Sequence, residues 1–375
     1  MSPGPGSDSG SGGNDASTGI TVFEQSLGLV RPYNTSRGRL RFRRTLLVGV
    51  THGGATGWGE AASLPGFGDE TPGAVARAAR RWVADLASGI WTRPPSVALG
   101  GAVDGALVDL VARSSGVRPA SVLSPGRVHD PVAVNALVTD PRPAGVAEEV
   151  SRRIGEGHRG VKLKVAFVEP ELDVARIDAA LGAAAGVPLR LDANRGWDHD
   201  TALRVLGAVS APVVVEEPTP DPSVSAEVCR SSGAGLALDE SWIPGSGSES
   251  VALALTRRGL VDTAVLKPSA LGGPLRTLNL ARSLERAGVT VVISSLLEGP
   301  VGLATAVHLA AATGPGPHGL ATATLFDTGF PAWLVPRAGY ITPPADSGPG
   351  VTPPTGGVPL VDVHVDAVPP LPAPA

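Results

Sequence analysis

Charged side chains stand at the ends of short apolar runs in the middle of this chain, where buried strands normally carry none. Lys162 and Lys164 lie in VKLKVAF, and Lys267 directly follows AVL. Three acids end similar runs, namely Asp192, Glu216 and Asp239. The carboxyl ends of the strands in a parallel barrel meet at one rim, so we expect all six side chains to converge on one site there.

Three carboxylates held close together repel one another unless a cation lies between them. Oxygen ligands without Cys or His favour a hard divalent ion, and Mg²⁺ is the usual choice where substrate oxygens complete its coordination. We therefore predict Asp192, Glu216 and Asp239 as ligands of Mg²⁺, with Mn²⁺ as a possible substitute. Glu217 and Glu240 follow one position later, so they should point to the opposite side and form ion pairs outside the ligand set.

The lysines are unusual because the chain has 31 basic residues and all but three are arginine. Arginine keeps its proton near neutral pH, whereas a nearby cation can lower the pKa of a lysine amine until it becomes a usable base. We predict a lysine base for a weakly acidic C–H next to a carboxylate, with Mg²⁺ stabilising the resulting enediolate. The alternative is that the lysines persist by chance and the acids serve as helix caps or surface ion pairs.

The spacing of the apolar runs predicts the elements that position these residues. Seven runs start 23 to 29 residues apart, which is the length of one strand plus one helix. They begin near Val132, Val161, Leu189, Val213, Leu236, Ala264 and Val289, and a weak eighth strand is expected near Leu320. This pattern favours a closed, modified TIM barrel of the (β/α)7β type. An open doubly wound sheet is the alternative, but no glycine-rich phosphate loop follows any run.

The remaining sequence divides into three parts. Residues 1–18 are rich in Gly, Ser and Pro and are predicted to be disordered. Residues 19–130 are predicted to form an α+β capping domain, with strand-like runs up to Glu60 and helices over 72–88 and 97–114. After the barrel, assigned to residues 131–321, a C-terminal segment (322–375) should pack partly on the cap and end in a Pro-rich tail.

Composition excludes several classes of protein. The net charge of −4 and pI of about 6.0 argue against nucleic-acid binding. The single cysteine, Cys229, rules out an intrachain disulfide and a thiolate-rich zinc site. No apolar run reaches membrane-spanning length and the first residues lack a signal-peptide pattern. We expect a cytoplasmic protein with a small-molecule substrate and no nucleic-acid or membrane partner; the oligomeric state stays open, a monomer being possible.

The charged runs together resemble the enolase superfamily. The matching pieces are WGEAASLPGF in the cap, then VKLKVA, LRLDANRGW, VVVEEPTP, LALDES, VLKPSALGG and ISSLLEGPVGLA. With lysines on both the second and the sixth barrel strands, the chain resembles the muconate-lactonizing-like branch of this superfamily. Within it, VNA, R-x-D and ISSLLEGPVG are most similar to the o-succinylbenzoate synthases, which dehydrate 2-succinyl-6-hydroxy-2,4-cyclohexadiene-1-carboxylate in menaquinone biosynthesis.

This resemblance implies roles for individual residues. Lys164 would take the α-proton and then protonate the departing hydroxyl, Lys267 would stabilise the enediolate from the other face, and Lys162 would assist charge balance. Substrate contacts are implied for Arg190, Asn194, Ser294, Ser295 and Gly299. Members with the same lysine pair also racemise N-succinylamino acids, epimerise dipeptides or cycloisomerise muconate. A catalytically silent barrel acting as a scaffold is a further alternative.

Overall fold

The computed structural model describes residues 18–35, 38–90, 92–327, 329–345, 348–351, 353 and 358–365. The tail predicted to be disordered lies outside these residues up to Ser17, and Thr18 already begins the first strand. The end of the Pro-rich tail, from Asp366 on, also lies outside them. The described chain contains a four-stranded sheet, a seven-stranded sheet and a two-stranded sheet.

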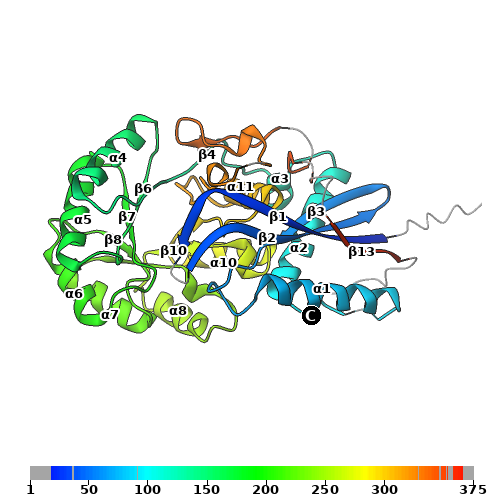
Figure 1. Cartoon of the computed structure of the whole chain (residues 1–375), viewed down its shortest axis with the longest axis horizontal. Helices are drawn as coiled ribbons and strands as arrows, with labels where there is room; N and C mark the ends of the chain where they lie inside the picture. Colours follow the sequence, from blue (N-terminus) through cyan, green and yellow to red (C-terminus); the bar gives the residue numbers. More distant parts are fainter. Residues whose placement is uncertain are drawn as a thin grey trace, which may run out of the picture.

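The four-stranded antiparallel sheet and its helices form the predicted α+β cap (Figure 1). Its strands, in the order β13-β1-β2-β3, are β1 (Thr18–Thr35), β2 (Gly38–His52), β3 (Ala55–Ala61) and β13 (Val358–Val365). The helices are α1 (Pro72–Ala87), α2 (Val97–Ser114) and α3 (Pro119–Leu123). Thr71 and Ser96 cap α1 and α2 by accepting from backbone N–H groups. Both predicted helices are confirmed.

Strand β3 packs so closely on α2 that it needs glycine. A Cβ at Gly59 would lie 1.8 Å from the carbonyl oxygen of Ala102. We expect Gly59→Ala to lower the free energy of unfolding by about 3 kcal/mol, because neither backbone can move away cheaply. Denaturant unfolding measures this against Gly100→Ala on α2, where no atom lies within 4 Å of the added Cβ. Equal midpoints for the two variants would contradict the close approach.

The seven-stranded sheet is parallel and curls into the predicted barrel. Its strands follow in chain order: β5 (Ala136–Val138), β6 (Val161–Lys164), β7 (Leu189–Asp192), β8 (Val214–Glu216), β9 (Gly235–Leu238), β10 (Thr263–Leu266) and β11 (Thr290–Ile293). The surrounding helices are α4 (Pro143–Gly155), α5 (Pro170–Ala184), α6 (His199–Ala208), α7 (Pro222–Ser232), α8 (Ser248–Arg257), α9 (Pro268–Leu271), α10 (Pro274–Arg286) and α11 (Pro300–Thr313). Helices α4 to α8 form the arc at the left of Figure 1.

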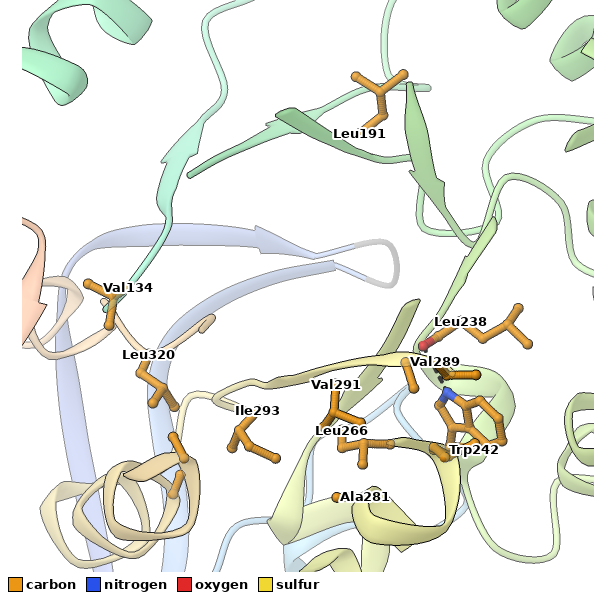
Figure 2. Packing of buried hydrophobic residues seen from close by; sticks show 14 of the residues in the cluster. Val134, Leu191, Leu238, Trp242, Leu266, Ala281, Val289, Val291, Ile293 and Leu320 are labelled. Atoms are coloured by element: carbon orange, nitrogen blue, oxygen red, sulfur yellow. Dashed lines mark hydrogen bonds between the residues drawn. The ribbon is translucent and has the colours of Figure 1, made fainter. Parts of the chain in front are cut away.

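A short segment closes the barrel between β11 and the start of β5. The N–H of Gly319 donates to the carbonyl of Ile293, and the N–H of Asn135 donates to the carbonyl of His318. The eighth strand expected near Leu320 is therefore present as two isolated parallel bridges, at His318 and Gly319. The buried side chains of Val134 and Leu320 flank this seam (Figure 2).

The run predicted as the first barrel strand divides into two strands. Its start, β4 (Val132–Ala133), pairs antiparallel with β12 (Tyr340–Ile341), and only β5 joins the barrel. The C-terminal segment thus returns to the barrel before β13 pairs with β1 in the cap. The segment also contains two short 3-10 helices, η2 (Ala323–Leu325) and η3 (Ala332–Leu334).

The imidazole of His318 lies at the seam of the barrel and is neutral there. Its Nδ1 accepts from the N–H of Ile293 at 3.0 Å while its Nε2 faces the carbonyl oxygen of Gly314 at 3.0 Å, so only the Nε2–H tautomer satisfies both. Burial lowers the pKa of His318 to about 4. Because the unfolded chain binds the proton more tightly, the stability due to this side chain is present above pH 6.5 and is lost as the pH falls towards 4.

We therefore expect the wild-type protein to lose roughly 3 kcal/mol of unfolding free energy through this side chain between pH 7.5 and pH 4. The variant His318→Gln should be less stable at pH 7.5 and should show a smaller loss on acidification. Urea unfolding at the two pH values measures both. Parallel losses in the two proteins would mean that His318 is not responsible for the acid sensitivity.

Alternation along the strands places charged side chains inside the barrel and apolar ones against the helices. Leu163 and Leu191 are fully buried and face outward, whereas their neighbours in sequence face the interior. Figure 2 shows the outward layer, in which the indole of Trp242 donates to the carbonyl of Leu238 at 2.9 Å. In register, Lys164 lies beside Asp192, which lies beside Glu216. The barrel interior is therefore polar at this level.

The β1–β2 hairpin reaches from the cap across the barrel (Figure 1). Leu29 of β1 belongs to a small apolar cluster with Leu297, which follows β11, and with Phe326 of the C-terminal segment. The cap is thus packed on the side of the barrel where the strands end. Among the described residues, no helix combines the length and the apolar character that crossing a membrane requires.

Candidate active site

Two lysines of β6 meet two acids of the neighbouring strands inside the barrel. The Nζ of Lys162 lies 2.6 Å from Asp192 Oδ2 and 2.8 Å from Glu216 Oε1, so this ammonium sits between two buried carboxylates. The Nζ of Lys164 lies 2.7 Å from the same oxygen of Asp192. The side chain of Lys164 is 24% exposed, against 13% for Lys162. Lys164 is therefore the more accessible of the two lysines.

Lys267 contributes the second half of the site, from the end of β10. Its Nζ lies 2.5 Å from Asp239 Oδ2 and 3.8 Å from the ring centroid of Phe67, a residue of the cap. Burial by itself would lower the pKa of Lys267, but the carboxylates of Asp239, Glu240 and Glu216 outweigh burial and raise it. The two lysine–acid groups thus form one electrostatic cluster, as the sequence predicted for residues more than a hundred positions apart.

Asn194 and Glu240 line the same cluster. Asn194 has a φ of +44°, and its side-chain oxygen accepts from Lys164 while its Nδ2 donates to Glu240 Oε1 at 3.3 Å. The expectation that Glu240 points away from the site is therefore wrong. The alternation ends with β9 at Leu238, and Glu240 already belongs to a 3-10 turn, η1 (Glu240–Trp242), which turns the side chain back.

Glu217 lies outside the cluster and forms the predicted ion pair. Its Oε2 accepts from Arg195 Nε at 2.9 Å. Its Oε1 accepts the backbone N–H groups of Asp239 and Ser241, at 3.0 and 2.8 Å. The buried carboxylate of Glu217 thus holds the backbone at the end of the next strand, where the side chain of Asp239 points into the site.

The carboxylates hold Lys162 and Lys267 in their charged forms. Burial by itself would lower the pKa of Lys162, but the charges of Asp192 and Glu216 outweigh burial and raise it. The lysine pKa lowering expected from the sequence is therefore not seen at Lys162. That expectation assumed a divalent cation that neutralises the same carboxylates, whereas here their full charge acts on the ammonium group.

The predicted magnesium ligands have suitable chemistry but are paired with lysines. Within the described ranges, no three His, Cys, Asp or Glu side chains converge on one point as a ligand set. Asp192, Glu216 and Asp239 nevertheless offer only oxygen donors from three adjacent strands, and two of them already enclose the ammonium of Lys162. These acids fit a hard cation, provided that the lysines move aside. The ligand set stays a prediction.

The predicted substrate contacts are engaged within the protein. Arg190 lies level with Lys162, deeper in the barrel than Asp192, and its Nε donates to Glu216 Oε2 at 3.0 Å. The backbone N–H of Gly299 donates to Glu60 of the cap at 2.7 Å.

The two serines that were predicted to contact the substrate also form hydrogen bonds within the protein. Ser294 donates to the carbonyl oxygen of Gly319 at 3.3 Å, and Ser295 donates to Glu298 Oε2 at 2.8 Å. Both are buried. Contacts of these side chains with a substrate stay predictions.

Sequence reasoning missed the residues that join the cap to the loop after β11. The buried guanidinium of Arg43 donates to the carbonyls of Ala62, Ser63, Leu296 and Leu297. Glu60 accepts from the backbone N–H groups of Gly299 and Gly302 at the N-terminus of α11, at 2.7 and 2.8 Å. Arg43 could have been suspected, since it lies on the same strand face as the apolar Leu47 of β2.

Comparisons with known proteins agree with this architecture. The family model described as "Enolase C-terminal domain-like" matches residues 145–355, and "MenC, N-terminal domain" matches residues 20–108. Muconate cycloisomerase 1 of Rhodococcus opacus is 32% identical, covering 76% of this chain and 81% of that protein. The o-succinylbenzoate synthase of Yersinia pseudotuberculosis is 30% identical, covering 79% of this chain and 88% of that protein.

A solved structure has the same fold. The enolase-superfamily member from Roseovarius nubinhibens, complexed with magnesium, superposes with a TM-score of 0.79 at 23% identity. The match covers 93% of this chain and all of that one. At this identity the likeness concerns the fold alone.

Proposed function

Because the chain belongs to the enolase superfamily, we propose that it is a Mg²⁺-dependent o-succinylbenzoate synthase. The reaction is the syn-dehydration of 2-succinyl-6-hydroxy-2,4-cyclohexadiene-1-carboxylate in menaquinone biosynthesis. The observation that carries the proposal is the pair of lysines on β6 and β10, facing one cluster of carboxylates. The match of the cap to the MenC N-terminal domain favours this substrate over those of other members.

The charges of the site fit a substrate with two carboxylates. Four cationic side chains (Lys162, Lys164, Arg190 and Lys267) face four acids (Asp192, Glu216, Asp239 and Glu240). With all four cations charged, a bound Mg²⁺ would leave two positive charges, and with Lys164 as the neutral base it would leave one, so the site has a positive excess that attracts a dianion. N-succinylamino acids and muconate share this property, so the charge balance defines the substrate class and does not select one member of it.

In this proposal Lys164 moves the protons. Its neutral amine takes the proton from the carbon next to the ring carboxylate, and the resulting ammonium returns a proton to the departing hydroxyl, so that water leaves and the ring becomes aromatic. Asn194 orients the amine through the hydrogen bond described above. The Lys267 ammonium, at the end of β10, stabilises the enediolate from the opposite face.

Asp192, Glu216 and Asp239 would hold the magnesium ion, each from the end of its own strand. Once bound, the ion would withdraw negative charge from the substrate carboxylate and so make the neighbouring C–H more acidic.

The direct test gives the purified protein and Mg²⁺ two substrates in parallel. Formation of o-succinylbenzoate is followed by its ultraviolet absorbance, and racemisation of an N-succinylamino acid by polarimetry. The proposal requires efficient dehydration with slower racemisation. Faster racemisation would make the racemase the function, and an inactive protein that binds neither substrate would favour a scaffold.

The runner-up function is a racemase or cycloisomerase of the same superfamily. Lys164 and Lys267 could act as bases on the two faces of one substrate, as racemisation requires. The identity to muconate cycloisomerase 1 also keeps cycloisomerisation open. Muconate is therefore included as a third substrate, with its loss of ultraviolet absorbance as the readout.

A further inference from the structure

The buried guanidinium of Arg176, on α5, is bonded to the backbone of Lys164. Its Nη2 donates to the carbonyl oxygen of Lys164 at 2.8 Å, and its Nε donates to the carbonyl oxygen of Asp140, beyond the end of β5, at 2.9 Å. Its Nη1 pairs with Asp173 at 2.6 Å, and both side chains of this pair are completely buried. The ring of Phe167 covers the guanidinium at 4.5 Å.

The same ion pair also holds the turn that follows Lys164. Ala166 adopts a φ of +62°, in the left-handed region, and its N–H donates to Asp173 Oδ2 at 2.7 Å. Between these two contacts, the N–H of Val165 donates to the carbonyl of Asp192 at 3.0 Å. The backbone from the carbonyl of Lys164 to the N–H of Ala166 is thus held by α5 and by β7.

We propose that Arg176 is a positioning residue for Lys164, fixing the strand end from which the amine reaches the site. The proposal rests on the base role of Lys164 given above. A lysine side chain is long and flexible, so the direction of its Cα–Cβ bond is what the fold can set. A displacement of about 1 Å at a reacting group can cost a factor of 10² in rate, so this restraint bears directly on turnover.

The type of contact explains why arginine is needed here. The planar guanidinium reaches two carbonyls and one carboxylate at once, whereas a lysine ammonium at this depth cannot span all three. A buried ion pair by itself is weak support for stability, since two charges must leave water to form it. An ion pair alone does not account for the two backbone contacts of Arg176. These contacts tie the ends of β5 and β6 together.

The kinetic test compares two variants with a control on the same helix. Arg176→Met keeps much of the side-chain volume but has no hydrogen-bond donor. Arg176→Lys keeps the charge but loses the planar set of N–H donors. We expect kcat to fall about 100-fold in the first and about 10-fold in the second, with KM nearly unchanged. Ile177→Ala is the control, because Ile177 is equally buried beside Arg176 and leaves the Lys164 contact in place. It should lower the unfolding midpoint without a comparable fall in kcat.

A second readout does not depend on turnover. The chain has three lysines, so uniform labelling with ε-¹³C-lysine gives three side-chain signals, and the Lys164→Arg variant identifies the one from Lys164. In either Arg176 variant we expect the Lys164 signal to shift or broaden while the Lys267 signal stays in place. If Arg176→Met does not fold, Arg176→Lys supplies both measurements.

These readouts keep the two proposals separate. An unmoved Lys164 signal, with kcat no lower than in Ile177→Ala, would overturn the role of Arg176. Absence of o-succinylbenzoate formation by the wild-type protein would overturn the proposed function, and the lysine spectrum would still decide whether Arg176 positions Lys164.

Discussion

Lys164→Arg is expected to lower kcat for dehydration by several orders of magnitude. Arginine keeps a positive charge near Asp192 and has a side chain of similar length. It cannot, however, become a neutral base at the assay pH. The loss should exceed the roughly 10²–10⁴-fold usual for a single acid–base group, because Lys164 is assigned both proton transfers. Steady-state kinetics with Mg²⁺ in excess measure the effect.

Two further variants make this result interpretable. Arg152→Lys, the reverse exchange at the surface of α4, should leave kcat unchanged. Lys267→Arg should keep a substantial part of the dehydration, since its assigned role needs only a positive charge next to Asp239. A Lys164→Arg enzyme with near-wild-type kcat would refute the base assignment. Lys267→Arg losing as much activity as Lys164→Arg would favour two bases and hence a racemase.

Glu216→Gln is expected to abolish magnesium-dependent turnover and to weaken Mg²⁺ binding by at least about 100-fold. Second-sphere partners of metals already account for 10–100-fold in affinity, and this change removes a charged ligand itself. Isothermal titration calorimetry with MgCl₂ measures the binding without requiring substrate. Treatment of the wild-type protein with EDTA should likewise abolish turnover, and added Mg²⁺ or Mn²⁺ should restore it.

The same substitution has a cost in the free protein that must be separated from the loss of metal. Glu216 accepts from Lys162 and Arg190, so Gln leaves two buried cations with weaker partners. Breaking such a buried pair costs about 3–5 kcal/mol, which urea unfolding in EDTA would detect. Glu249→Gln, at an exposed ion pair on α8, is the matched control and should change neither quantity. Unaltered Mg²⁺ affinity in Glu216→Gln would contradict the ligand assignment.

The order of charged runs was sufficient to predict the barrel and the convergence of the cluster. Lys164, Asp192 and Glu216 each end a strand, and a parallel barrel brings all strand ends to one rim. Period-two alternation then determines which of two neighbouring residues faces inward, as at Glu216 and Glu217. These conclusions need only local patterns and the rule that parallel strands share a direction.

The sequence could not predict what lies beyond the regular strands. Glu240 returns to the site because a 3-10 turn replaces the alternation after Leu238. The chain pairs β4 with β12 although these two strands are far apart in sequence. No local periodicity encodes such contacts, since they depend on which segments meet after the barrel has formed.

The role of long-range contacts is clearest at the two buried arginines. Arg43 and Arg176 carry the same charge as the many surface arginines. The strand face of Arg43 indicates burial at most, and no neighbouring residue indicates that Arg43 holds the loop after β11 or that Arg176 holds the carbonyl of Lys164. Residue type and spacing thus determined the kind of chemistry and the strands that bear it. The tertiary structure decided which groups hold those strand ends in place, because a hydrogen bond to a backbone carbonyl has no sequence signature at the acceptor.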